Sequence, residues 1–167
     1  GFLKNVNCLT KELIINAASQ GVEIALMEDK KLVELHNEKA DASFAVGDLY
    51  LGKVKKLIPG LNAAFVDVGF EKDAFLHYTD LSPYIRSLLK FTNIAINDKT
   101  EGGFDFGKFS VEPEIVKTGK IAEVLNGRPN ILVQILKEPI AAKGPRLSCE
   151  ISLPGRFVVI TPFNDIV

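Results

Sequence analysis

Residues 60–77 read GLNAAFVDVGFEKDAFLH, and their composition and spacing predict two β-strands joined by a turn. Successive side chains of a strand point to opposite faces, so Ala64 and Val66 share one face while Phe65 and Asp67 share the other. Phe65 therefore lies with an aspartate, on the face that a soluble strand normally gives to water. A large ring in that position needs an explanation.

The second strand of this hairpin repeats the arrangement. Ala74 and Leu76 form its apolar face, and Phe75 falls in step with Asp73 and His77. Two rings with the same outward parity on adjacent antiparallel strands can form a platform on which nucleic-acid bases stack. The same parity also fits rings buried as a secondary core beneath the long loop or the amino-terminal hairpin. Parity alone leaves both interpretations open.

Glycine and proline residues around the hairpin predict a small barrel. A strand in LYLGKVKKLIPG precedes it, and further strands follow in NILVQILKEP and PRLSCEISL. About five strands of this kind are what a Greek-key OB barrel needs. The segment between them contains SPYIRSLLKF, whose spacing of apolar residues predicts a helix within a long insertion.

Upstream of the barrel, ELIINAA and GVEIALMEDKKLVELHNEK predict a short strand followed by a β-hairpin. Three strands with one apolar face cannot close a core alone, so they need to pack on another segment. The expected fold class is therefore mainly β, with a five-stranded OB barrel after an incomplete three-stranded unit.

Composition limits the classes of function. The chain has 167 residues, 47% of them hydrophobic, and a formal net charge of −1, which gives no global reason to bind a polyanion. No apolar run approaches the roughly 20 residues that span a bilayer, and no signal peptide is visible, so we expect a cytoplasmic protein. Cys8 and Cys149 match no metal-ligand spacing and are interpreted as reduced core residues.

The sequence offers little support for catalysis. It contains no standard phosphate-binding glycine loop, and its only histidines, His36 and His77, accompany no recognisable nucleophile motif. Asp67 and Asp73 flank one turn and could hold a hard cation, although solvated turn carboxylates are the favoured interpretation. We expect no catalytic residue, metal or cofactor in this chain.

Positive charge gathers locally. Residues 119–156 hold six basic residues against three acidic ones, and the first barrel strand adds Lys53, Lys55 and Lys56. A lysine-rich strand can equally be a protected sheet edge. Binding of nucleic acid through such cations releases counterions and depends on salt concentration.

Two long runs closely resemble the amino-terminal part of the RNase E/RNase G family. They are VGDLYLGKVKKLIPGLNAAFVDVGFEKDAFLH and GRPNILVQILKEPIAAKGPRLSCEISLPGRFVVITP, and ELIINAASQGVEIALMEDKKLVEL extends the resemblance upstream to Glu12. The resemblance implies an RNase H-like subdomain interrupted by an S-one-type OB barrel that binds RNA. The expected organisation is a flexible extension at 1–11, the first RNase H-like part at 12–46, the OB domain at 47–151 with an insertion at 82–129, and the start of a 5′-sensor region at 152–167.

The resemblance also assigns site residues. The RNA contacts of the family's barrel fall on Phe65 and Phe75, and the basic contact of its KG(x)RL segment falls on Lys143. Strand parity adds His77, which is in phase with Phe75. We therefore expect these four residues to bind single-stranded RNA.

A second expected site is a sensor for an RNA 5′-monophosphate. In the family this sensor begins in an ISLxGxYxV segment, here ISLPGRFVV, which places its first elements at Gly155 and Val159. Glycine suits this task because a backbone N–H must approach a phosphate oxygen closely. Phe157 replaces the more common tyrosine, and the Arg-Thr portion of the sensor is absent.

The resemblance implies that catalysis lies elsewhere. The family's catalytic aspartates hold magnesium in a DNase I-like subdomain beyond Val167, and the cysteines of its zinc-linking motif between protomers are also absent. We therefore expect the RNA-binding portion of an endoribonuclease that leaves 5′-phosphate products in ribosomal RNA processing and messenger RNA decay. This portion alone should be inactive, while the full-length enzyme would be a homo-oligomer with Mg²⁺ and an interprotomer Zn²⁺.

Two other classes of function remain open at this point. A non-catalytic OB-fold regulator or chaperone would use the same ring platform, and a reading frame that stops near Val167 would favour it. A protein-interaction domain would use the exposed rings as a hydrophobic hot spot. Its affinity would be insensitive to salt and to added RNA.

Overall fold

The computed structural model describes residues 10–39, 44–97, 107 and 109–164. The chain divides into two compact units, Gly1–Ser43 and Phe44–Val167. Most of the extension expected at 1–11 lies outside the described residues, and Lys11 is already the first residue of a strand.

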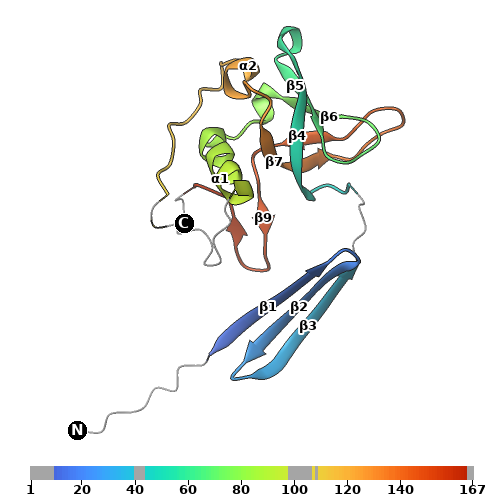
Figure 1. The fold of residues 1–167 in the computed structure, drawn as a ribbon, viewed down its shortest axis with the longest axis vertical. Helices are drawn as coiled ribbons and strands as arrows, with labels where there is room; N and C mark the ends of the chain where they lie inside the picture. The colour runs from blue at the N-terminus through green and yellow to red at the C-terminus, as the bar shows by residue number, and fades with distance from the viewer. Residues whose placement is uncertain (1–9, 40–43, 98–106, 108, 165–167) are drawn as a thin grey trace, which may run out of the picture. The chain divides into compact units, whose positions relative to one another are not determined.

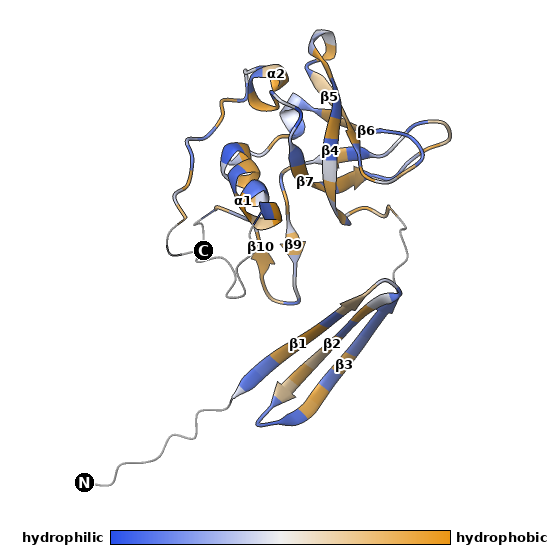
Figure 2. Ribbon diagram, in the orientation of Figure 1, coloured by the Kyte–Doolittle hydropathy of each residue, from blue (hydrophilic) through white to orange (hydrophobic). Residues whose placement is uncertain are grey.

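The first unit is an antiparallel sheet with the order β1-β2-β3 (Figure 1). Its strands are β1 (Lys11–Ala18), β2 (Gly21–Glu28) and β3 (Lys31–Lys39), which confirms the three predicted strands. The prediction of a single apolar face is wrong, because Leu13 pairs with Leu26 on one face and Ile14 pairs with Ala25 on the other. Figure 2 shows hydrophobic positions in all three strands. The side chains of β1 and β3 are exposed throughout, so this sheet has no buried core of its own.

The second unit contains a closed five-stranded barrel with the order β4-β5-β6-β8-β7. Its strands are β4 (Leu49–Ile58), β5 (Ala63–Asp67), β6 (Ala74–His77), β7 (Asn130–Lys137) and β8 (Arg146–Ser148). Neighbouring strands are antiparallel except β6 and β8, which are parallel. The predicted mainly β fold with a five-stranded OB-like barrel is confirmed.

The inside of the barrel follows the predicted alternation. Ala64, Val66, Ala74 and Leu76 are completely buried. They pack in one core with apolar side chains of the other strands, including Val54, Ile131, Val133, Ile135 and Leu147. Gly52 lets β4 approach β5 closely, since a Cβ there would lie 2.5 Å from a methyl group of Val66. The period-2 pattern of residues 60–77 therefore sets which side chains form the core.

Described parts of the segment between β6 and β7 pack against the barrel. It contains η2 (Tyr78–Asp80), α1 (Ile85–Asn97) and α2 (Ile121–Val124). The predicted helix is confirmed as α1, which buries Ile85 and Leu88 and packs against β7. Within the described residues, no helix is long and apolar enough to cross a membrane.

Side-chain hydrogen bonds fasten these connections to the barrel. Asn62 follows η1 (Pro59–Leu61), and its side-chain amide donates to the Gly119 carbonyl and accepts from the Ile121 amide. The buried Gln134 donates to the Gly47 and Ser152 carbonyls. After β8, a short hairpin of β9 (Leu153–Pro154) and β10 (Val159–Ile160) follows.

Candidate nucleic-acid interface

Four side chains form a continuous row across the outer surface of the barrel. Lys56 on β4 is the cross-strand partner of Phe65 on β5, and Phe65 is the partner of Phe75 on β6. Phe75 is in turn the partner of Arg146 on β8. Cross-strand partners share one face of a sheet, so the two rings lie between two cations.

The two rings are in contact and remain accessible. The centroids of Phe65 and Phe75 lie 6.2 Å apart with the ring planes at 69°, an edge-to-face arrangement. His77 continues the aromatic surface, with its ring centroid 6.5 Å from that of Phe75 and the planes at 25°. All three side chains are half-buried. This partial exposure favours a platform over a fully buried secondary core.

A groove of about 740 Å³ opens beside the rings. Phe65 and Phe75 line it together with the cationic side chains of Lys72, Lys143 and Arg146. The structure therefore brings three of the sequence-predicted RNA contacts, Phe65, Phe75 and Lys143, into one hollow. The fourth, His77, lies next to Phe75 but does not line this groove.

The cationic side chains of the groove differ in whether a carboxylate of the chain already pairs with them. The Arg146 guanidinium donates to both carboxylate oxygens of Asp80, from Nε at 3.0 Å and from Nη2 at 3.2 Å. Lys72 and Lys143 are exposed, and neither ammonium has an ion-pair partner within the part of the chain that the structure describes. Lys72 and Lys143 are therefore the groove cations available to an anionic ligand.

His77 also has a local structural role. Its Nδ1 accepts a hydrogen bond from the Thr79 amide at 3.2 Å and lies 2.8 Å from the Thr79 hydroxyl. An Nδ1 that accepts from a backbone amide places the proton of the neutral ring on Nε2. The ring is thus held in one orientation at the start of η2.

Lys55 lies between the two turn carboxylates. Its Nζ is 3.0 Å from Asp67 Oδ2 and 3.0 Å from Asp73 Oδ1. The hydrogen bond to Asp73, followed by that to Asp67, raises the pKa of the Lys55 ammonium. The Gly69 amide, followed by Lys55, lowers the pKa of the Asp67 carboxyl. The Lys55 ammonium therefore lies between Asp67 and Asp73, the two carboxylates considered above as possible ligands of a hard cation.

The lysines of β4 do not protect a sheet edge. β4 pairs with β5 on one side and with β7 on the other, so the strand has no free edge within the closed barrel. Lys53, Lys55 and Lys56 are all exposed on its outer side. Of the two interpretations left open by the sequence, the structure supports outward cations.

The sensor residues expected from the resemblance lie on the β9–β10 hairpin. The Gly155 amide donates to the Val158 carbonyl at 2.7 Å, which closes the turn, and Val159 is the cross-strand partner of Pro154. Phe157 at the tip is 85% exposed, and the Arg156 guanidinium lies 4.9 Å from its ring centroid. The structure thus brings Gly155 and Val159 together, although neither lines the groove of the barrel.

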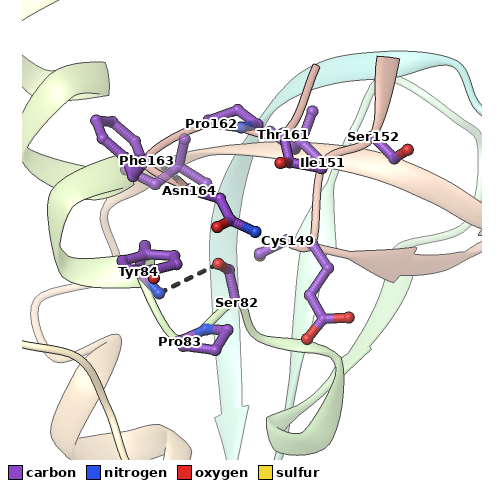
Figure 3. A pocket seen from close by; sticks show the side chains of 12 residues that line it. Ser82, Pro83, Tyr84, Cys149, Ile151, Ser152, Thr161, Pro162, Phe163 and Asn164 are labelled. Atoms are coloured by element: carbon purple, nitrogen blue, oxygen red, sulfur yellow. Dashed lines mark hydrogen bonds between the residues drawn. The ribbon is translucent and has the colours of Figure 1, made fainter. Parts of the chain in front are cut away.

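A second pocket, of about 380 Å³, lies between α1 and the carboxy-terminal segment (Figure 3). Cys149 lines it as a buried free thiol, and burial raises the pKa of that thiol. The Ser82 hydroxyl oxygen accepts from the Tyr84 amide at 3.1 Å, as the dashed line shows. Cys149 is therefore a buried core residue with a free thiol, as predicted, whereas Cys8 lies outside the described residues. No group of three or more potential metal ligands converges among the described side chains.

Sequence reasoning did not select Lys56, Lys72 or Arg146 as site residues. Lys56 has the same parity as the buried Val54, so simple alternation would point it into the barrel. A lysine at an inward position of a core strand is itself a signal of a β-bulge. Arg146 offers no such local signal, because its position opposite Phe75 depends on the parallel contact between β6 and β8.

A closed five-stranded barrel whose outer surface carries rings and cations defines an OB-like module. Ribonuclease G of Salmonella typhimurium is 32% identical to the chain over 154 residues, and ribonuclease G of Haemophilus influenzae is 33% identical over 154 residues. Ribonuclease E of a Nostoc species is 35% identical over 157 residues. The chain is therefore similar over nearly its whole length to ribonucleases of the RNase E/RNase G family.

These alignments cover 92% to 93% of the chain. They cover 27% of each ribonuclease G and 18% of the Nostoc ribonuclease E, so the chain spans about a quarter or less of the relatives it matches. No family model matches the chain.

Proposed function

We propose that this chain is the single-stranded RNA-binding region of an endoribonuclease of the RNase E/RNase G type. The observation that carries the proposal is the row of Lys56, Phe65, Phe75 and Arg146 on the outside of the barrel. The ribonuclease names of the relatives support the same class and favour it over a non-catalytic regulator or chaperone.

The physical basis is stacking combined with charge neutralisation. Each base that stacks on an aromatic side chain contributes roughly 1 to 3 kcal/mol, and every base offers a flat face for this contact. Phe65 and Phe75 would accept neighbouring bases, and His77 would extend the surface beyond Phe75. Lys72 and Lys143 would neutralise backbone phosphates. A duplex hides its base faces, so the platform should prefer single strands.

The β9–β10 hairpin would contribute to recognition of an RNA 5′-monophosphate. The motif around Gly155 and Val159 supports this assignment, and Arg156 adds a cation next to it. The Gly155 amide already donates to the Val158 carbonyl, so a phosphate would have to share or replace that hydrogen bond. We also propose the domain limits given above, namely 12–46, 47–151 with the insertion 82–129, and 152–167.

The longer protein would hydrolyse phosphodiester bonds and leave 5′-phosphate products in ribosomal RNA processing and messenger RNA decay. Magnesium, bound in a region outside this chain, would polarise the phosphate of the RNA and activate the attacking water. We assign no residue of this chain to magnesium or to an interprotomer zinc ion. The chain alone should therefore bind RNA without cleaving it, and the full-length protein would be a cytoplasmic homo-oligomer.

The test is a binding titration of the chain with a fluorescent single-stranded RNA of about 12 nucleotides, a length suited to one OB barrel. The same RNA in a duplex provides the comparison. We expect tighter binding of the single strand, and an affinity that falls as salt rises from about 50 to 200 mM. Equal affinity for both forms, or binding that ignores salt, would contradict the proposal. Incubation with magnesium and gel analysis of the RNA tests for the absence of cleavage.

A further inference from the structure

Lys55 occupies a β-bulge in the strand that borders the aromatic row. Val54 pairs with Val66 and Lys56 pairs with Phe65, so Lys55 is an extra residue without a partner on β5. A bulge of this kind re-aims the side chain that it carries. Lys55 and Lys56 are consequently both exposed on the outside of the barrel.

The bulge delivers the Lys55 ammonium to both ends of the β5–β6 loop. Asp67 is the last residue of β5 and Asp73 immediately precedes β6, and Lys55 Nζ lies 3.0 Å from an oxygen of each. Asp67 Oδ1 also accepts from the Gly69 amide at 3.0 Å. One side chain of β4 therefore ties together the two ends of a loop that carries Lys72.

The two carboxylates lie near the rings that are proposed to bind RNA. Asp73 lines the same groove as Phe65, Phe75, Lys72 and Lys143. Asp67 is two residues from Phe65 on the same outer face. Without a counter-charge, two carboxylates in this place would repel phosphate groups and would also repel each other.

We propose that Lys55 is a positioning residue for RNA, which pairs with Asp67 and Asp73, offsets part of their negative charge and fixes the β5–β6 loop so that the groove accepts a negatively charged strand. This inference rests on the proposed RNA-binding function. Lys55 acts here through the two aspartates, whereas Lys72 and Lys143 act on the RNA itself. Its role is thus to offset part of the negative charge of the turn at the wall of the groove.

A mutant cycle separates this role from a direct contact with phosphate. The variants are Lys55→Gln, the double variant Asp67→Asn with Asp73→Asn, and the triple variant that combines all three changes. We expect Lys55→Gln to weaken binding of the single-stranded RNA by about tenfold. The two asparagine changes should restore most of that loss in the Lys55→Gln background, and they should change affinity by a clearly smaller factor when Lys55 is present.

A direct contact between Lys55 and phosphate gives a different pattern. The two asparagine changes would then improve affinity by the same factor with and without Lys55, because they would act only by removing negative charge. Additive effects of this kind would overturn the proposal. Lys55→Arg serves as the conservative control, since a guanidinium can bridge the same two carboxylates and should retain affinity.

The outcomes also separate this inference from the function on which it rests. A wild-type chain that binds single-stranded RNA but shows additive effects would refute only the role of Lys55. A wild-type chain that does not bind the RNA would refute both. Thermal unfolding of every variant shows whether a loss of affinity follows a loss of folded protein, and we expect only small changes in the midpoints because the ion pairs of Lys55 with Asp67 and Asp73 are solvent-exposed.

Discussion

The rings of Phe65 and Phe75 meet edge to face, with their centroids 6.2 Å apart, on directly opposite positions of β5 and β6. This contact joins two half-exposed rings into one surface beside a groove that also holds Lys72 and Lys143. The arrangement explains why two large apolar rings lie on the polar side of a hairpin. They are placed for contact with a flat ligand, and the bases of single-stranded RNA are such ligands.

Replacing either ring by leucine should weaken RNA binding while leaving the fold intact. Leucine keeps much of the apolar volume but has no flat face, so Phe65→Leu and Phe75→Leu should each cost roughly 1 to 3 kcal/mol of binding free energy. That range corresponds to about 5- to 150-fold in affinity. A titration with fluorescent single-stranded RNA measures the change.

Aromatic replacements provide the matched control for this prediction. Phe65→Tyr and Phe75→Tyr retain a flat ring and should bind RNA within a few-fold of the wild type. If leucine and tyrosine variants bound equally well, apolar contact rather than stacking would account for the affinity.

Removing a groove lysine should change the salt dependence of binding as well as its strength. Lys143→Met and Lys72→Met each delete one cation that is free to meet a phosphate, so the slope of log affinity against log salt should become smaller by about 1. Lys117→Met is the control, because Lys117 is exposed but does not line the groove. A slope that stays the same in the Lys143 variant would place this lysine outside the path of the RNA backbone.

Gly144 supports one wall of the groove through its lack of a side chain. A Cβ at Gly144 would lie 2.3 Å from the Asp73 carbonyl oxygen and 2.8 Å from that of Lys72. Gly144→Ala should therefore displace the β5–β6 loop, lower the free energy of unfolding by about 1 to 3 kcal/mol and weaken RNA binding.

Gly60→Ala is the matched control for Gly144→Ala. A Cβ at Gly60 would have no neighbour within 4 Å, so this change should affect neither stability nor affinity appreciably. Denaturant unfolding measures the stability of both variants. A stable Gly144→Ala variant with native affinity would show that the loop tolerates displacement.

Cys149 should make stability depend on pH above the ordinary thiol range. Burial raises the pKa of the Cys149 thiol in the native state, so this group stabilises the fold fully below the unfolded pKa of about 8.5. Above that pH the unfolded thiol ionises and the native thiol does not. The free energy of unfolding should then fall by up to about 1.4 kcal/mol per pH unit.

A comparison of variants isolates this effect from other titrating groups. Both proteins carry Cys8→Ser, and one also carries Cys149→Ala. The difference in the free energy of unfolding between them should be constant from about pH 6 to 8. From about pH 9 the protein that retains Cys149 should lose stability relative to the Cys149→Ala variant. A difference that does not change with pH would mean that the native thiol ionises as easily as the unfolded one.

The sequence predicted those parts of the site that depend on strand alternation. Side chains alternate between the two faces of a strand with a period of two, and this needs no knowledge of neighbouring strands. It predicts that Phe65 and Phe75 face outward and that Ala64 and Leu76 are buried. The helical spacing near Ile85 was equally local and corresponds to α1.

Other parts of the site depend on tertiary pairing and could not be predicted in this way. The bulge at Lys55 reverses the facing of Lys56, and its position is set by the register with β5. Arg146 reaches Phe75 through a parallel contact between strands far apart in the sequence. The strand predicted in PRLSCEISL is shorter than expected and ends at Ser148. The next amide, that of Cys149, donates to the Asp80 carbonyl of η2 and not to a carbonyl of a neighbouring strand.

Photochemical crosslinking can show whether RNA bases stack on Phe65 and Phe75. A single-stranded RNA that carries 5-iodouridine forms covalent adducts with an aromatic side chain against which the base is stacked, and mass spectrometry of the digested protein locates the adduct. We expect adducts on Phe65 or Phe75, and we expect them to be lost in the Phe65→Leu, Phe75→Leu double variant. Adducts confined to another ring such as Phe157, with the same yield in the double variant, would contradict it.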